Sequence, residues 1–397
     1  MPAVQSDRQE RVRVPGDSRA GGESDTTMET THRVVVGDSR DLPLPDDSVD
    51  LVVTSPPYPM IEMWDDAFGS MNDDAAAALA AGDGERAFEA MHAVLDDVWA
   101  EVQRVLCPGG IACVNVGDAT RTLDDRFRVY PNHARVLSAF EELGFDPLPD
   151  ILWRKPANSA AKFMGSGMVP PSAYVTLEHE YVLVFRNGER RSFEPGADRR
   201  YEAAYFWEER NRWFSDVWTD VQGEGQDLDV TDARERSAAF PFAVPYRLVN
   251  MYSVYGDSVL DPFWGTGTTS LAAMVAGRDS VGVDRDPEVV GAFDERVAAV
   301  SDLSRSVVDE RLDDHRAFVR EVHENGESFE YEAEHYDFPV RTQQEREIRF
   351  YAVDDVQAVT DSESVADGEP VADGEPVEQA YRVGYRPVGT DDDLAGR

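Results

Sequence analysis

Cysteine, lysine and long apolar runs are scarce in this chain, and each shortage excludes a class of protein. The two cysteines, Cys107 and Cys113, are too few for a disulfide framework or a cysteine-based metal centre, so we expect no metal site. No stretch approaches the roughly 18 apolar residues that a transmembrane helix needs. The polar residues 1–31 lack the apolar core of a signal peptide. We therefore expect a cytoplasmic protein without membrane contact, whose residues 1–31 form a disordered leader.

Positive charge is also in short supply. Lysine and arginine number 38 against 78 aspartates and glutamates, the net charge is -40, and Lys155 and Lys162 are the only lysines. A nucleic-acid-binding protein ordinarily carries a basic face. Abundant carboxylates with almost no lysine resemble the proteins of halophilic archaea, because about 1 M salt shortens the Debye length to roughly 3 Å and screens the self-repulsion. The alternative is a generic acidic protein that avoids DNA.

One window departs from this acidic composition. Residues 151–177 contain no aspartate or glutamate, yet they include Arg154, Lys155 and Lys162. A surface that approaches phosphate groups needs cationic and small donor side chains and is poorly served by carboxylates. The window therefore predicts a DNA-contacting surface, with a neutral loop over the core as the alternative.

Short apolar runs alternate with helical spacing along most of the chain. The runs at residues 33–36 and 49–54 are nearly continuous, as in buried parallel strands, and residues 85–106 have helical periodicity. This alternation predicts an α/β fold with a doubly wound, Rossmann-like sheet. The expected divisions are the leader 1–31, a first half at 32–185, an Arg- and Trp-rich segment without periodicity at 186–239, a second half at 240–303, and an acidic extension with a low-complexity linker at 304–397.

A glycine-containing loop follows the short strand at residues 258–260. Gly265 and Gly267 allow a backbone to approach a ligand closely, and the loop opens into a helix whose free amides favour an anionic group. Asp284 ends the next strand, where Rossmann-like folds place an acceptor for ribose hydroxyls. Ser270 stands where a nicotinamide fingerprint needs its third glycine, and the P-loop lysine is missing. The loop predicts a nucleotide-like ligand, with an ordinary tight turn as the alternative.

The sequence Ser55-Pro56-Pro57-Tyr58 ends the strand at residues 49–54. Two prolines fix the backbone and remove two amide donors, so the carbonyl groups stay free to accept. A hydroxyl and a carbonyl together can hold both hydrogens of an exocyclic amine. An aromatic ring beside them can stack on a base that has left its duplex. A simple Pro-Pro turn after a strand is the alternative.

Together these loops resemble the amino-methylating DNA methyltransferases, with the catalytic loop before the cofactor loop, the circularly permuted order called the beta class. The resemblance extends from about Val34 to Val300. It implies a permuted Rossmann-like methyltransferase fold with a target-recognition region inserted at 186–239, an acidic C-terminal extension, S-adenosylmethionine as cofactor and double-stranded DNA as partner. A cognate restriction enzyme is a further partner that the resemblance allows. In this family Ser before the prolines mostly accompanies cytosine N4, and Asp mostly accompanies adenine N6. An adenine-N6 enzyme, an RNA amino-methyltransferase and a non-catalytic DNA-binding regulator remain alternatives.

The family pattern also assigns roles to individual residues. Trp264 departs from it, because a small residue often stands there, and the packing of the loop is therefore open. In the inserted region, arginines such as Arg199, Arg200, Arg210 and Arg212 are candidates for contacting base edges. The expected site consists of Ser55, Pro56, Pro57 and Tyr58 for catalysis; Asp38, Asp261, Phe263, Gly265, Gly267, Thr268 and Asp284 for the cofactor; and Arg154, Lys155 and Lys162 for DNA.

Overall fold

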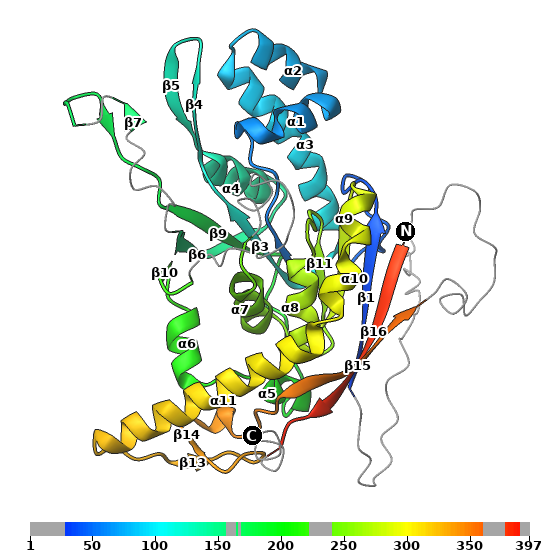
Figure 1. Ribbon diagram of the computed structural model, residues 1–397, viewed down its shortest axis with the longest axis vertical. Coiled ribbons are helices and arrows are strands. Elements are labelled where there is room, and N and C mark those ends of the chain that lie inside the picture. Colours follow the sequence, from blue (N-terminus) through cyan, green and yellow to red (C-terminus); the bar gives the residue numbers. More distant parts are fainter. Residues whose placement is uncertain (1–27, 156–163, 166–167, 222–239, 360–377, 390–397) are drawn as a thin grey trace, which may run out of the picture.

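The computed structural model describes residues 28–155, 164–165, 168–221, 240–359 and 378–389 (Figure 1). Lys162, most of the expected leader, residues 222–239 of the expected insertion and the duplicated linker lie outside these ranges. None of the helices described is long and apolar enough to cross a membrane.

The centre of the described fold is a ten-stranded mixed sheet. Five neighbouring strands run parallel and carry the two loops. Both flanks of the sheet contain antiparallel strands, and the sequence pattern did not distinguish these from the parallel ones. In order across the sheet the strands are β10 (Val217–Trp218), β6 (Asp146–Arg154), β9 (His179–Arg186), β3 (Leu106–Val116), β2 (Val49–Thr54), β11 (Ser258–Asp261), β12 (Asp279–Asp284), β1 (Glu29–Val36), β16 (Glu378–Pro387) and β15 (Tyr351–Val359).

Helices cover both faces of the sheet, because the strand side chains are apolar on both sides. Val35 and Val52 join one core, while Val34, Leu51 and Val53 join the other, as the two-residue period of a strand requires. The first core packs against α3 (Gly84–Val105) and α4 (Asn132–Glu142). The second core packs against α7 (Ala243–Tyr252), α8 (Thr268–Ala276), α9 (Pro287–Gly291) and α10 (Phe293–Val297).

Two expected boundaries are wrong. Residues 29–31, assigned to the leader, belong to β1, where Glu29 pairs with Gly384 of β16. The boundary at residue 304 falls inside α11 (Val300–Glu324). Beyond it, β13 (Tyr331–Glu332), β14 (Pro339–Val340) and η3 (Gln343–Glu345) lead into β15 and β16, so this part of the expected extension completes the main sheet. Strands β1 and β16 pair although they lie near opposite ends of the sequence, and local sequence patterns cannot reveal such a pairing.

The described part of the expected insertion is also joined to the main sheet. It forms α5 (Asp198–Glu202), α6 (Trp207–Trp213) and the edge strand β10, which pairs with β6. Trp218 of β10 is fully buried, and its indole N–H donates to the carbonyl of Trp213 at 2.9 Å.

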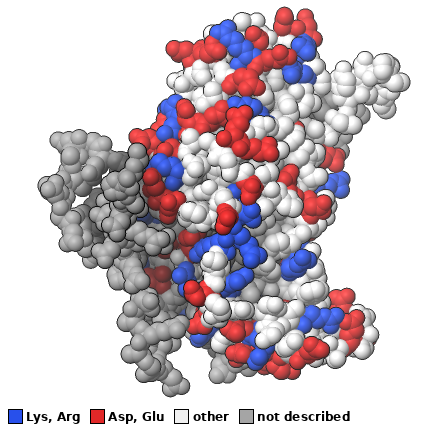
Figure 2. Space-filling model, turned by 180° about the vertical axis from the view of Figure 1, so that it is seen from behind, with Lys and Arg blue, Asp and Glu red and all other residues white. Residues whose placement is uncertain are grey.

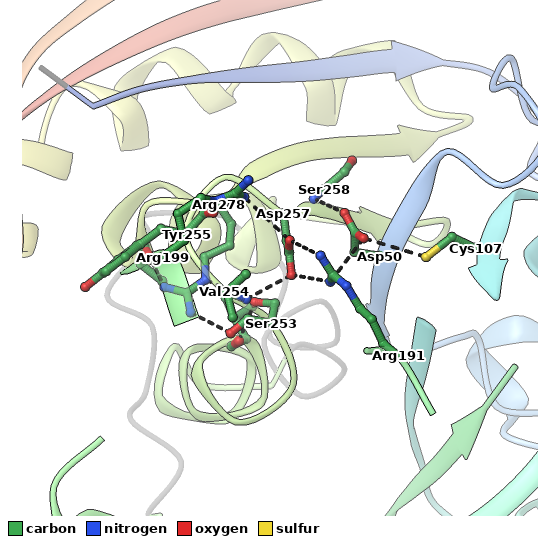
Figure 3. A network of polar contacts seen from close by, with 12 residues as sticks. Asp50, Cys107, Arg191, Arg199, Ser253, Val254, Tyr255, Asp257, Ser258 and Arg278 are labelled. Atoms are coloured by element: carbon green, nitrogen blue, oxygen red, sulfur yellow. Dashed lines mark hydrogen bonds and ion pairs between the residues drawn. The ribbon is translucent and has the colours of Figure 1, made fainter. Parts of the chain in front are cut away.

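A polar network built around the buried Asp257 stands at the amino ends of the parallel strands (Figure 3). Arg191 donates to both carboxylate oxygens of Asp257, at 2.7 and 2.9 Å, and lies 3.1 Å from Asp50. Asp50 accepts from the amide of Ser258 at 3.0 Å. Arg199 donates to the carbonyl of Tyr255 at 2.7 Å. The network ties the chain that follows β9 to the starts of β2 and β11, so Arg191 and Arg199 have a structural role here.

Several projections extend from the end of the molecule opposite α5 and α11 (Figure 1). One is the hairpin of β4 (Ala119–Leu123) and β5 (Arg126–Tyr130), and another carries β7 (Met164–Gly165) and β8 (Ala173–Tyr174). Next to the first lie η1 (Glu62–Trp64), α1 (Asp65–Met71) and α2 (Asp73–Ala80).

Candidate active site

A cavity of about 730 Å³ brings the two loops together at the carboxyl ends of β2, β11 and β12. Thr54 at the end of β2 donates to Asp261 at the end of β11, with an Oγ1–Oδ1 distance of 2.7 Å. Because parallel neighbouring strands end at the same edge of a sheet, loops far apart in the sequence become adjacent. Of the expected site residues, the cavity is lined by Asp38, Ser55, Pro56, Pro57, Tyr58, Lys155, Asp261, Phe263, Gly265, Thr268 and Asp284.

A chain of hydrogen bonds starts at Ser55. Its Oγ lies 3.0 Å from the hydroxyl of Tyr58, which donates to Glu180 Oε2 at 3.2 Å. Asn115 Nδ2 donates to the same two acceptors, at 2.9 Å to Tyr58 and 2.8 Å to Glu180. Lys155 Nζ contacts the other oxygen of Glu180 at 2.9 Å. The sequence reading did not assign Asn115 or Glu180 to the site.

Asn115 Nδ2 also donates to Ser55 Oγ, at 3.4 Å, so one lone pair of that oxygen is engaged and one is left over. Burial, and then the charge of Glu180, raise the pKa of Tyr58, so the phenol keeps its proton. A phenol has one proton, and Tyr58 gives it to Glu180. The oxygen of Tyr58 therefore accepts the proton of Ser55, and the second lone pair of Ser55 Oγ is available to a donor in the cavity.

The ring of Tyr58 lies against Gly117, just after β3. A Cβ at Gly117 would stand 3.0 Å from Tyr58 Cε2 and 3.3 Å from Glu180 Cγ, so glycine leaves room for both side chains. Tyr58 lines the cavity, where a base could meet it. That its ring stacks on a base remains a prediction. The sequence did not show which groups form hydrogen bonds with the Tyr58 hydroxyl.

The two loop glycines are required for different reasons. At Gly265, with φ of +53°, the only neighbour of an added Cβ is the carbonyl oxygen of Phe263 at 3.9 Å, so the position opens toward the cavity. At Gly267, with φ of +77°, an added Cβ would stand 2.5 Å from the ring of Phe293 and 2.6 Å from Trp264. Gly267 thus makes room for packing of the core, and its expected contact with the ligand stays a prediction.

Trp264 is accommodated in that core. Its side chain is buried, and its indole N–H donates to Ser270 Oγ at 2.8 Å. Opposite the indole lies Gly282 of β12, where an added Cβ would come within 2.0 Å of Trp264 Cδ1. The departure from the family pattern is therefore compensated by a glycine in the neighbouring strand.

Three carboxyl groups organise the loops around the cavity. Burial raises the pKa of Asp261 to about 6, against opposing hydrogen bonds from Thr269 and Thr54. Asp284 accepts from the amide of Gly265 at 2.9 Å, and burial raises its pKa. The hydrogen bonds from Arg40 lower the pKa of Asp38. Each acid thus holds part of the loop structure, beside any contact that it makes with a ligand.

Apolar residues also line the cavity, and the sequence did not show that they belong to it. They come from η1, α1, α3 and the preceding loop, where helical periodicity alone predicts ordinary core positions. These residues are Ile61, Trp64, Phe68, Met71, Val94, Leu95 and Val98. The cavity therefore combines polar loop residues with hydrophobic ones, as small-molecule sites commonly do.

The described residues expected to contact DNA do not lie together on one open surface. Lys155 lies in the cavity network with Glu180, and not on an open outer surface. Arg154 is exposed and pairs with Glu178 at 3.2 Å. Arg212 pairs with Asp314 at 3.3 Å.

Neither cysteine is among the residues that line the cavity, and neither is suited to act as a nucleophile. Burial, followed by the charge of Asp50, raises the pKa of Cys107 to about 11, and Cys113 is buried within β3. A thiol with a raised pKa is a poor nucleophile at neutral pH.

Comparison with known proteins identifies this architecture. The model of the DNA methylase family that covers N6 and N4 methyltransferases matches residues 49–295. The chain belongs to this family. It is 49% identical over 328 residues to the Type II methyltransferase M.MthZI of Methanothermobacter thermautotrophicus, covering 82% of this chain and 91% of that protein. It is 45% identical over 280 residues to the Type II methyltransferase M.MjaI of Methanocaldococcus jannaschii, covering 68% and 91%.

A solved structure agrees with this assignment. The DNA modification methylase TTHA0409 of Thermus thermophilus, in complex with S-adenosyl-L-methionine, has a TM-score of 0.54 and 33% identity. The match covers 68% of this chain and 94% of that one. The chain is thus a DNA methyltransferase, and its cofactor is S-adenosylmethionine.

The cavity fits this cofactor. Gly265 leaves open the space that a Cβ would fill, and Asp38 and Asp284 present carboxylates to it. Thr268 begins α8, whose free amides favour a carboxylate group such as that of the amino-acid part. These residues, with Phe263 and Asp261, would hold the cofactor, which supplies an electrophilic methyl group when bound.

Proposed function

We propose that this enzyme methylates the exocyclic N4 amine of cytosine in double-stranded DNA, and that it belongs to the permuted beta class. The observation that carries the proposal is the arrangement at Ser55, whose Oγ offers one lone pair to the cavity because its proton is directed to Tyr58 and Asn115 takes only the other lone pair. A serine, and not an aspartate, precedes Pro56 and Pro57. Glu180 keeps Tyr58 in the orientation that this requires.

The proposed reaction begins with a cytosine turned out of the duplex into the cavity. Ser55 Oγ and the carbonyl of Pro56 accept the two amine hydrogens, which draws the nitrogen lone pair out of conjugation with the ring. The nitrogen then attacks the methyl carbon as the carbon–sulfur bond breaks. Positioning supplies a large share of the acceleration.

The methylated amine must finally lose one proton. The chain from Ser55 through Tyr58 to Glu180 gives that proton a path, since each oxygen accepts from the one before it. In this proposal Ser55 receives the amine proton, Tyr58 receives the serine proton, and Glu180 receives the phenol proton. The partly buried carboxylate of Glu180 thus acts as the final acceptor.

The setting of the reaction is part of the proposal. Acidic groups are spread over the described surface, with basic groups beside them (Figure 2), and the chain has a net charge of -40. We infer that the enzyme works in concentrated salt, as halophilic proteins do. Because both curated relatives are named Type II methyltransferases, a cognate restriction enzyme is the partner to seek.

Nucleoside mass spectrometry of treated nucleic acid tests the proposal. Duplex DNA and RNA are each incubated with the purified chain and S-adenosylmethionine, in dilute and in molar KCl. We expect N4-methylcytosine in DNA. N6-methyladenine alone would overturn the cytosine assignment, and methylated RNA with unmodified DNA would overturn the DNA assignment. Binding of cofactor is measured in parallel, because its absence would favour a non-catalytic regulator.

A further inference from the structure

An exposed apolar segment stands at the rim of the cavity. We name residues 168–177, which include β8, the arm. Met168, Val169 and Val175 are 86%, 65% and 81% exposed, and Tyr174 is 49% exposed. Apolar side chains gathered on a projecting segment are a mark of an interaction site, whereas single exposed ones are ordinary.

The arm is rooted in the active site and braced there. Leu177 at its base lines the same cavity as Tyr58, and so do the next residues in the chain, Glu178 to Glu180. The ring of Tyr174 stacks on Phe127 of β5, with centroids 5.0 Å apart and planes 9° from parallel. The β4–β5 hairpin that carries Phe127 begins just after Gly117 and Asp118, which also line the cavity. Both hairpins are therefore held in place relative to the site where a base would enter.

The arm is free of carboxylates in a chain that is otherwise strongly acidic. Residues 151–177 contain no aspartate or glutamate, although the chain has 78 such residues. In Figure 2 the arm projects at the upper right and carries no red atoms, while acidic residues are common over the rest of that face. A polyanion could approach this projection without repulsion from its own side chains.

We propose that the arm is an apolar wedge that enters the DNA stack at the target base. This inference rests on the proposed function and adds the means by which the base leaves the duplex. Met168 and Val169 would occupy the space that the base vacates, since methionine adapts to irregular gaps and apolar side chains can separate stacked bases. DNA is the occupant that the observations favour, because the arm continues into the base cavity and lacks repelling charge.

The test uses the full chain and two duplexes that differ only at the target. The target sequence is read by methylation-aware sequencing of treated DNA. One duplex has the target cytosine paired with guanine, and the other has an abasic site opposite it, so that the base is already loosened. The variant is Met168→Ser with Val169→Ser, and Met168→Leu with Val169→Ile is the conservative partner. Val129→Ser removes an exposed apolar side chain, 43% exposed on β5, as the matched control.

We expect the serine variant to lose at least about tenfold in kcat/KM on the paired duplex and less than about threefold on the loosened one, because unstacking is the step that it impairs. The conservative variant and Val129→Ser should match the wild type on both duplexes, and cofactor affinity should be unchanged in all of the variants. Equal loss on both duplexes, or no loss, would overturn the wedge.

Two other outcomes also count against the inference. If the serine variant turns a dimer into a monomer in sedimentation, the arm is a contact between two copies of this chain. If the wild type methylates neither duplex, the proposed function fails and the wedge fails with it. If the wild type is active on the paired duplex and the serine variant is equally active, the wedge is refuted and the proposed function is not.

Discussion

Replacing Glu180 by glutamine should slow methyl transfer while leaving cofactor binding nearly intact. Glu180 accepts from Tyr58 at 3.2 Å and from Asn115 at 2.8 Å, and it pairs with Lys155 at 2.9 Å. A glutamine has one acceptor oxygen and an NH2 group that only donates, so with its oxygen turned to the cationic Lys155 it faces Tyr58 and Asn115 with donors. The phenol proton of Tyr58 loses its fixed direction, and Ser55 no longer presents its free lone pair reliably.

The size of the effect follows from the bonds that are lost. A hydrogen bond to a charged group contributes about 1.5–3 kcal/mol. At about 1.4 kcal/mol for each factor of ten, losing one of them from the reacting arrangement lowers kcat by roughly 10- to 150-fold. If Glu180 also accepts the final proton, the loss should lie at the upper end of this range or beyond it.

The assay is single-turnover transfer of a radiolabelled methyl group to duplex DNA, with cofactor affinity measured separately. The control is Glu334→Gln, which breaks an exposed ion pair with Arg346 at 2.8 Å and should change little. Tyr58→Phe keeps the ring but removes the hydroxyl, so the double variant with Glu180→Gln should be no slower than the slower single variant. The reasoning is refuted if Glu180→Gln keeps turnover within about twofold, or if the two effects simply multiply.

Three further predictions follow from the loops. Gly265→Val should abolish cofactor binding, measured by calorimetry, in a protein that circular dichroism shows to be folded. Gly267→Ala should instead lower thermal stability, because its Cβ meets two rings. Equal effects of the two variants on cofactor binding and on thermal stability would contradict this. Ser55→Ala should leave cofactor affinity within about twofold and cut kcat by roughly 10²-fold or more, and unchanged kcat would exclude its role. Asp261 should bind a proton more readily in the folded state, since burial raises its pKa from 3.8 to about 6; its contribution to the free energy of unfolding therefore falls by up to about 3 kcal/mol as pH rises from about 4 to 6, and Asp261→Asn should flatten that decline in denaturant titrations.

The sequence determined those features whose cause is local. The two prolines after Ser55 and the glycine at position 265 could be interpreted from residue type alone. Proline restricts the backbone and glycine frees it, whatever surrounds them. Alternating apolar runs likewise predicted strands covered on both faces, since side-chain direction follows from the backbone period. These features were enough to predict an α/β fold and a nucleotide-like ligand, and the family resemblance of the two loops implied S-adenosylmethionine, which the comparisons support.

Tertiary structure alone decided what depends on distant neighbours. Asn115 looks like one polar residue in an apolar strand, and Glu180 is one of 78 acidic residues, until β3 and β9 pair and bring both to Tyr58. Gly267 looks like a ligand-binding glycine, and only the structure shows that Phe293 packs against it. The pairing of β16 with β1 joins the two ends of the described chain. Contacts of this kind depend on which surfaces meet, and a pattern of neighbours along the chain does not encode that by itself.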